Sequence, residues 1–145
     1  MAELGVAAEQ ILLAYKSRIR TFVEMNVPLW HFSLTKKMTK HIEKLQRISV
    51  FIILGVNADQ DYYCNLAMLE LETLEERRVT IVRNFATKTL KHPVHRNLFK
   101  FSVPNNTRSG KKVKVIEPHT RTVRYAKSSI PALSKYINQH LSDHL

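Results

Sequence analysis

The amino-acid sequence predicts a mainly α-helical protein, in which a helical hairpin is followed by further helices and a small β-hairpin is expected near the C-terminus. Three observations carry this prediction. Apolar residues recur at three- and four-residue spacing, residues that cap helices precede these segments, and prolines or glycines follow them. With 145 residues, of which 44% are hydrophobic, the chain is long enough to bury a core without disulfide bonds or metals.

The first two segments predict an antiparallel helical hairpin with its corner at residues 28–33. Pro28 ends the first helix, because the residue before a proline avoids the helical conformation. The second helix begins at Ser33 or Thr35, which are both good N-cap residues, and ends at Gly55. Trp30 is expected to anchor the core at the corner. The apolar stripes are Leu12, Tyr15, Ile19 and Phe22 in the first helix, and Leu34, Met38, Ile42, Leu45, Ile48 and Ile52 in the second.

Three further helices are predicted. Asn57 opens a short helix through Tyr62, Tyr63, Leu66 and Leu69. Thr73 and Glu76 form a capping box at the start of the next helix, which Pro93 ends. Its expected buried face consists of Leu74, Ile81, Phe85 and Leu90. Ser129 is expected to cap a last helix over residues 130–141, with Leu133, Ile137 and Leu141 on one face.

The segment before the last helix alternates with a period of two residues. Residues 112–117 and 122–125 have the pattern of short strands and predict a hairpin across residues 118–121. The prediction is therefore a helical domain over residues 1–100, followed by a basic loop or hairpin and a terminal helix over residues 101–145 that packs on it.

The charge is strongly basic and unevenly distributed. The formal net charge is +11, and residues 72–145 hold 15 Lys and Arg against 5 Asp and Glu. Residues 77–127 contain 14 basic residues and a single acidic one, Glu117. Such a block attracts a polyanion, most commonly nucleic acid, although a basic surface can also serve only to keep a protein in solution.

Several classes of protein are excluded by composition. A single cysteine, Cys64, cannot form an intrachain disulfide or a cysteine zinc cluster and suits a reducing compartment. Three glycines are too few for a glycine-rich phosphate loop. No apolar run approaches the length that spans a bilayer, and the N-terminus lacks a secretory pattern. We expect a nuclear or cytoplasmic protein that is not secreted, has no membrane partner and needs no cofactor.

Neither a metal centre nor an active site is predicted. His92 and His95 lie three residues apart, but Pro93 breaks the helix that would align them, and no third ligand accompanies them. Asp59 and Asp61 are the closest pair of aspartates, and helix capping explains them. The glutamates at 72, 75 and 76 are explained by the capping box and by pairing with the neighbouring arginines.

A collinear series of short motifs extends over most of the chain, from about residue 11 to residue 137. The N-terminal motifs are residues 19–24 (IRTFVE), 27–31 (VPLWH), 33–35 (SLT), 42–47 (IEKLQR) and 52–55 (IILG). The later motifs are residues 71–78 (LETLEERR), 85–88 (FATK), 107–109 (TRS), 121–125 (RTVRY) and 128–131 (SSIP). This series resembles the region that follows the palm in the reverse transcriptases of non-LTR (LINE-type) retrotransposons.

The resemblance implies the thumb and C-terminal extension of an RNA-directed DNA polymerase. The palm motif with its pair of aspartates is absent, as is the upstream endonuclease, so the chain by itself is not expected to be an enzyme. Because it starts at Met1, it resembles a truncated open reading frame, a remnant or a separate exon. The implied partners are RNA and DNA, as a template–primer duplex bound through its backbone without sequence preference.

Two groups of cations would make that contact. Lys36, Lys40, Lys44 and Arg47 would line one face of the second helix. The tail would contribute Arg108, Lys111, Lys112, Lys114, Arg121 and Arg124, and either Tyr125 or Phe99 could stack on a base unless both are core residues. Two alternatives remain: a helical protein-interaction module without nucleic-acid function, and a helix-turn-helix protein that reads duplex sequence.

Overall fold

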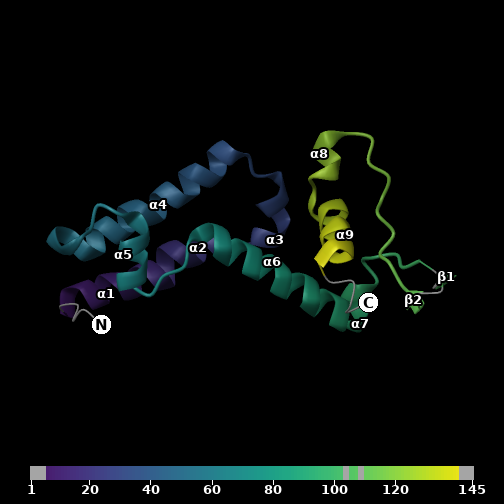
Figure 1. Ribbon diagram of the computed structural model, residues 1–145, viewed down its shortest axis with the longest axis horizontal. Helices are drawn as coiled ribbons and strands as arrows, with labels where there is room; N and C mark the ends of the chain where they lie inside the picture. Colours follow the sequence, from purple (N-terminus) through teal and green to yellow (C-terminus); the bar gives the residue numbers. More distant parts are fainter. Residues whose placement is uncertain (1–5, 103–104, 108–109, 141–145) are drawn as a thin grey trace. The chain divides into compact units, whose positions relative to one another are not determined.

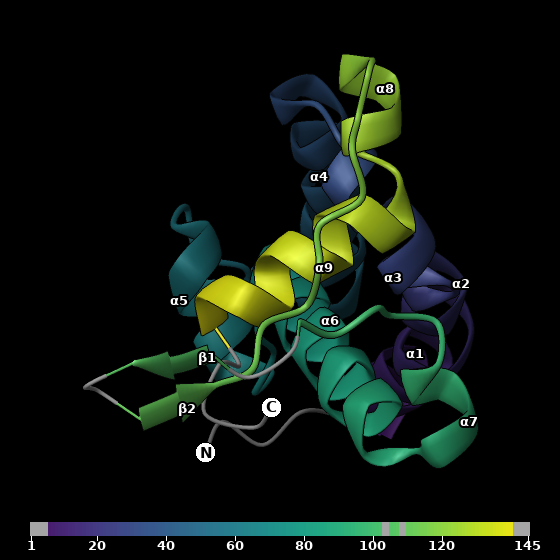
Figure 2. The same cartoon turned by 90° about the vertical axis from the view of Figure 1, so that its right-hand side faces the viewer.

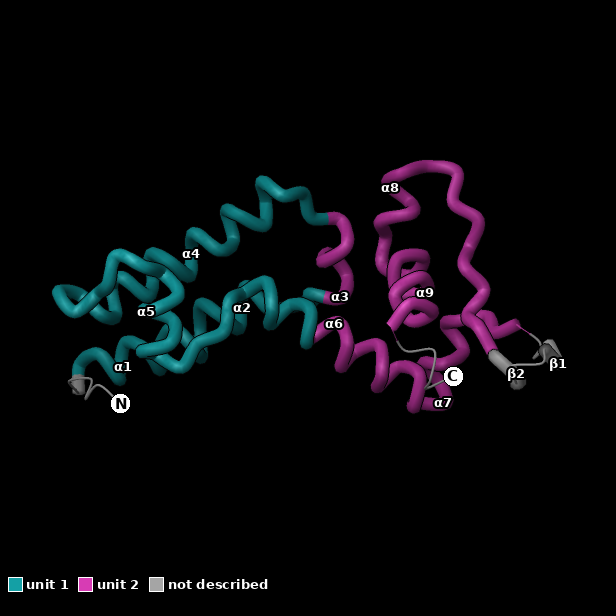
Figure 3. Tube along the Cα trace, viewed as in Figure 1, with its two compact units in different colours: residues 1–27, 34–80 teal, residues 28–33, 81–145 magenta. Residues whose placement is uncertain are grey.

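A computed structural model describes residues 6–102, 105–107 and 110–140 (Figure 1). The predicted mainly α-helical fold class is confirmed. The chain divides into two compact units (Figure 3). Unit 1 comprises Met1–Val27 and Leu34–Thr80, and unit 2 comprises residues 28–33 and Ile81–Leu145. The division at residue 80 lies inside a helix and differs from the boundary at residue 100 suggested by the sequence.

Unit 1 contains the predicted helical hairpin. Its first arm is a continuous helical segment made of α1 (Val6–Ala14), a π-helical stretch (Tyr15–Arg20) and α2 (Thr21–Glu24), and its second arm is α4 (Lys36–Leu54). The two arms run in opposite directions in Figure 1. Thr35 is the N-cap of α4, because its side chain accepts a 3.2 Å hydrogen bond from the backbone N–H of Met38.

The first arm ends before Pro28 is reached. Met25 is extended and Asn26 adopts a left-handed conformation with φ of 56°, which asparagine tolerates better than most residues. The chain then forms α3 (Val27–Trp30) and a 3-10 turn (His31–Ser33). Val27 is completely buried and Trp30 is half-buried. The role of Trp30 as a core anchor therefore stays a prediction.

The core of unit 1 uses a different face of α4 from the expected apolar stripe. Gln46, Val50, Ile53 and Leu54 are buried, whereas Met38, Leu45, Ile48 and Ile52 are 48–64% exposed. The core cluster joins the α4 residues to one residue of the first arm, two of α5 and two of the following loop, and consists of Tyr15, Val50, Ile53, Leu54, Tyr62, Leu66, Leu69 and Leu71. A polar residue, Gln46, therefore faces inward while four large apolar residues face outward.

The apolar stripe predicted for the first arm is also buried only in part. Tyr15 is 3% exposed, but Ile19 and Phe22 are 47% and 74% exposed. The π-helical stretch explains the difference, because its wider turns shift the residues after Tyr15 relative to the 3.6-residue period that the prediction assumed.

The remaining helices of unit 1 begin at acidic and hydroxyl caps. α5 (Tyr62–Met68) starts later than the predicted Asn57, since Asp61 is its N-cap and accepts a 3.1 Å hydrogen bond from Tyr63 N. The predicted capping box is confirmed at α6 (Leu74–Lys91), where Glu76 N donates to Thr73 Oγ1 at 3.2 Å and Thr73 N donates to Glu76 Oε2 at 3.1 Å.

The buried face of α6 agrees with the prediction only in part. Leu74 and Leu90 are buried, but Ile81 is half-buried and Phe85 is 38% exposed. The other buried residues of this helix are Arg78, Val82, Ala86 and Thr89. The helix ends at Lys91, before Pro93, which is the first residue of the short helix α7 (Pro93–Arg96).

Unit 2 contains the only hairpin found in the described residues, but it lies elsewhere than predicted. Strand β1 (Asn105–Thr107) pairs antiparallel with β2 (Gly110–Lys112), and a bridge between Phe101 and Val115 extends the pairing. Residues 122–125, expected to be a strand, instead belong to the start of α8 (Val123–Ala126). The reason is local: the Thr122 side chain accepts a hydrogen bond from Tyr125 N and caps a helix there.

The terminal helix α9 (Ser129–His140) lies beside the extended segment that follows β2 (Figure 2). The Asn138 side chain accepts from Val115 N and donates to Val115 O, both at 2.9 Å. Leu133 and Ile137 are buried as predicted, and Leu141 lies outside the described residues. Among the residues that the structure describes, no helix is long and apolar enough to cross a bilayer.

Candidate nucleic-acid interface

The division into units separates the charge more sharply than the sequence suggested. Unit 1 has 10 Lys and Arg and 10 Asp and Glu, so it is formally neutral. Unit 2 has 13 Lys and Arg against 2 Asp and Glu and accounts for the whole net charge of +11. An electrostatic site for a polyanion is therefore expected in unit 2.

Cations of unit 1 are partly neutralised by carboxylates. The Arg77 guanidinium forms a two-point contact with Glu24, in which Nε donates to Oε1 and Nη2 donates to Oε2 at 3.0 Å. This hydrogen bonding raises the pKa of Arg77. Arg20 lies 3.8 Å from the same carboxylate, and Glu72 lies 3.9 Å from Arg77. These residues connect the first arm of the hairpin to the start of α6.

In unit 2, by contrast, none of the Lys and Arg side chains that the structure describes is in an ion pair. Glu117, the acidic residue of unit 2 within the described part of the chain, accepts a hydrogen bond from Asn138 instead. Exposed cations occur along the whole unit and are Arg83, Lys88, Lys91, Arg96, Lys100, Lys114, Arg121, Arg124, Lys127 and Lys135. The Arg96 guanidinium lies 4.7 Å above the centre of the Phe101 ring. Exposed cations without a carboxylate partner are available to phosphate groups.

The predicted group on α4 is split by the structure. Lys36, Lys40 and Lys44 are exposed, and their spacing of four residues places them along one face of the helix. The Arg47 guanidinium lies 4.7 Å above the centre of the Tyr62 ring. It also lines a pocket of about 320 Å³ together with Glu43, Glu75, Glu76 and others.

The predicted tail residues fall into three groups. Lys114, Arg121 and Arg124 are exposed in unit 2. The backbone of Lys111 and Lys112 belongs to β2, while their side chains lie outside what is described. Arg108 also lies outside the described residues. All six belong to unit 2, whereas the four residues on α4 belong to unit 1.

The structure distinguishes the two aromatic candidates for base stacking. Phe99 is 5% exposed and belongs to the core of unit 2. Tyr125 is 47% exposed on α8, one residue after Arg124. Tyr125 is therefore the aromatic ring that a base could reach. The site residues predicted from the sequence did not include the cations of α6 and α7, although the run of 14 basic residues contained them.

The acidic and histidine candidates have structural roles or no partners suited to chemistry. Asp61 caps α5, and Asp59 accepts a 2.8 Å hydrogen bond from Asp61 N. The rings of His92 and His95 stack with their centres 4.3 Å apart. Among the described residues, no group of three or more His, Cys, Asp or Glu could hold a metal ion. The pKa of Cys64 is raised by desolvation and by Asp61, which disfavours its nucleophilic thiolate.

No protein-family model, curated protein or solved structure matches the chain.

Proposed function

We propose that this chain binds the sugar-phosphate backbone of nucleic acid, and that unit 2 supplies most of the contact. The observation that carries the proposal is the charge of that unit, with 13 Lys and Arg against 2 Asp and Glu. Its described cations are exposed and have no carboxylate partner. Phosphate contacts of this kind give affinity without reading sequence.

The motif series narrows the proposed ligand to a template–primer duplex of RNA and DNA. In that role the chain acts as the thumb-like, non-catalytic part of a retrotransposon reverse transcriptase. The three exposed lysines of α4 add a second contact from unit 1. Arg47 contributes least, because its guanidinium already stacks on Tyr62 and it lines a pocket that three glutamates also line.

The test is the salt dependence of binding to a labelled RNA–DNA duplex. Neutralising Lys114, Arg121, Arg124 and Lys127 to glutamine should flatten the log–log salt dependence by up to about 0.9 per lost contact, or about 0.7 on a single strand. The weakening should be nearly uniform across sequences, because backbone contacts carry no base information. Helix content should be unchanged, since all four side chains are exposed.

A matched pair of variants separates a local contact from a loss of total charge. Arg121→Gln with Arg124→Gln removes two charges from unit 2, and Lys16→Gln with Arg18→Gln removes two from unit 1. We expect the first pair to flatten the slope and the second to leave it nearly unchanged. Equal effects would contradict a contact made by unit 2. Binding that ignores salt would favour a protein-interaction module, and preference among duplex sequences would favour a sequence reader.

A further inference from the structure

Unit 1 exposes an apolar seam along α4, in which the exposed His41 takes the place between Met38 and Leu45. Met38, Leu45, Ile48 and Ile52 are 52%, 49%, 48% and 64% exposed. They are separated by seven, three and four residues, which places them on one face of the helix. This is the spacing with which a helix contacts another helix in a coiled coil. In the described part of unit 1, nothing buries this seam.

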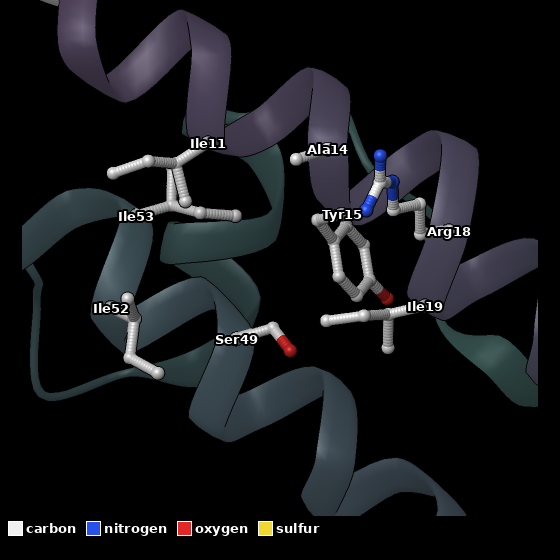
Figure 4. A pocket seen from close by; sticks show the side chains of 8 residues that line it. All are labelled: Ile11, Ala14, Tyr15, Arg18, Ile19, Ser49, Ile52 and Ile53. Atoms are coloured by element: carbon white, nitrogen blue, oxygen red, sulfur yellow. The ribbon is translucent and has the colours of Figure 1, made fainter.

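The seam continues into a groove between α4 and the first arm of the hairpin. Figure 4 shows the groove lined by Ile11 and Ile19 on one side and by Ile52 and Ile53 on the other. Its volume is about 190 Å³. Ile11, Ile19 and Ile52 are each more than 40% exposed, so the groove is open to solvent. Contiguous exposed apolar surface of this kind is typical of binding sites.

The period of the seam indicates what kind of element would cover it. A stripe that repeats every three to four residues along a helix matches the apolar stripe of a second helix, which would lie along α4 with its side chains entering the groove. A membrane surface offers no comparable fit to a concave groove between two helices.

The charges beside the seam indicate which charges the partner helix should carry. Lys37 and Lys44 lie seven residues apart on one flank of the seam and are exposed. Arg18 lines the groove from the first arm, within the π-helical stretch (Figure 4). Residues that flank a coiled-coil seam select partners of opposite charge. A second copy of this chain would bring the same lysines and a net charge of +11, so its charge does not fit.

We propose that the seam and groove of unit 1 bind an amphipathic helix of a partner protein, whose apolar stripe is flanked by aspartate and glutamate. The proposal leaves the cations of unit 2 free for nucleic acid. It shares Lys44 with the second nucleic-acid contact proposed for α4, so the apolar variant Ile52→Asp is the one that separates the two proposals. It assigns to the neutral unit a role in recruiting another protein.

Two designed helical peptides test the proposal with the full chain. Both carry the same heptad apolar stripe, and the flanking positions are glutamate in one and lysine in the other. By fluorescence anisotropy, the glutamate peptide should bind about tenfold more tightly at low salt, since each flanking pair changes from attraction to repulsion. The difference should narrow as salt is added.

Variants locate the binding. Ile52→Asp should weaken the glutamate peptide about tenfold or more, because it places a charge in the apolar contact. The control Val79→Asp introduces the same charge at a 45% exposed valine of α6 and should leave peptide binding unchanged. Lys44→Glu should weaken the glutamate peptide and strengthen the lysine peptide. Circular dichroism and the melting temperature check that each variant is folded.

Three results would overturn the proposal. The first is equal binding of both peptides. The second is binding of the glutamate peptide that survives Ile52→Asp. The third is evidence that something else covers the seam. Self-association in sedimentation that Ile52→Asp abolishes would identify a second copy of the chain. Flotation with anionic vesicles that Ile52→Asp abolishes would identify a membrane surface.

Discussion

The hydroxyl of Tyr15 donates a 2.8 Å hydrogen bond to Gln46 Oε1, and this buried contact joins the two arms of the hairpin in unit 1. Gln46 Nε2 in turn donates a 2.8 Å hydrogen bond to the carbonyl oxygen of Glu72, just before α6. One side chain thus connects three segments. Gln46 and the apolar seam lie on different faces of α4. Because the face with Gln46 points into the core, the face with the seam points to solvent.

Replacing Gln46 with leucine should destabilise the protein by about 1–3 kcal/mol, although leucine is more apolar. The buried hydroxyl of Tyr15 and the carbonyl of Glu72 both lose a partner. Urea denaturation measures the free energy of unfolding of the wild type and each variant. Combining Gln46→Leu with Tyr15→Phe should cost less than the sum of the two single changes, because the double variant buries no unpaired hydroxyl. Strict additivity would mean that the two side chains do not interact.

Alkaline pH should weaken unit 1 through its buried tyrosines. Burial raises the pKa of Tyr15 to about 12, and burial with the hydrogen bond to Glu43 raises the pKa of Tyr62 further. An unfolded tyrosine loses its proton near pH 10, while folded Tyr15 keeps it. The stabilisation is therefore complete below about pH 10 and is lost as the pH rises toward 12.

The measurement compares urea midpoints of the wild type and Tyr15→Phe between pH 8 and 12. The comparison removes effects of lysine titration, which both proteins share. Wild type should lose stability relative to Tyr15→Phe only above about pH 10. A constant difference over the whole range would show that Tyr15 titrates normally.

Arg78 should be replaceable by methionine with a gain in stability. Arg78 is 1% exposed, and its Nε and Nη1 atoms have no hydrogen-bond partner. Burial lowers its pKa, against the opposing effects of Glu75 and Glu43. Methionine has a similar length and no desolvation cost, so we expect about 1–3 kcal/mol of stabilisation. Arg83→Met, at an exposed position of the same helix, should change stability by less than about 0.5 kcal/mol. A loss of stability in Arg78→Met alone would reveal a partner for the guanidinium.

Tyr125 should contribute to binding of single-stranded RNA by stacking. Tyr125→Ala should weaken binding by about 1–3 kcal/mol, which is the usual worth of one base on an aromatic ring. The control is Tyr63→Ala, which removes a 67% exposed tyrosine from unit 1. Fluorescence titrations at one salt concentration compare the two variants. If both or neither lose affinity, Tyr125 is not a stacking site.

The chain alone should not incorporate nucleotides on any template with Mg²⁺ or Mn²⁺. Two-metal nucleotidyl transfer needs converging carboxylates, and Asp59 and Asp61 are used to form the start of α5. A primer-extension assay with a homopolymer template tests this. Incorporation that persists after Asp59→Asn and Asp61→Asn would place an active site elsewhere in the chain.

Local sequence signals predicted helix ends well. The capping box of Thr73 and Glu76 was predicted and is confirmed, as is the end of α6 before Pro93. These signals depend on hydrogen bonds between residues three positions apart, so a short stretch of sequence contains all the information. Where two local patterns competed, the prediction failed: residues 122–125 alternate like a strand, but Thr122 caps a helix.

The candidate interface was predictable as a charge block but not as a geometry. The excess of Lys and Arg after residue 76 can be read from the sequence, and it predicts that the tail cations contact phosphate. Only the structure showed that Phe99 is buried, that Tyr125 is exposed and that the Arg47 guanidinium stacks on the Tyr62 ring. Each of these depends on residues distant in the chain.

By itself, the sequence determined the helical class, the hairpin of the first two long helices and the basic character of the second half. It also determined the caps at Thr35, Gly55 and Thr73. The tertiary structure alone decided which face of each helix is buried. Sequence periodicity shows which face of a helix is most hydrophobic. Which face is buried depends on the segments that pack against the helix. In α4 the face opposite Tyr15 and Leu66 includes Gln46, whose two hydrogen bonds satisfy its polar atoms, and the more apolar seam of Leu45, Ile48 and Ile52 remains in solvent.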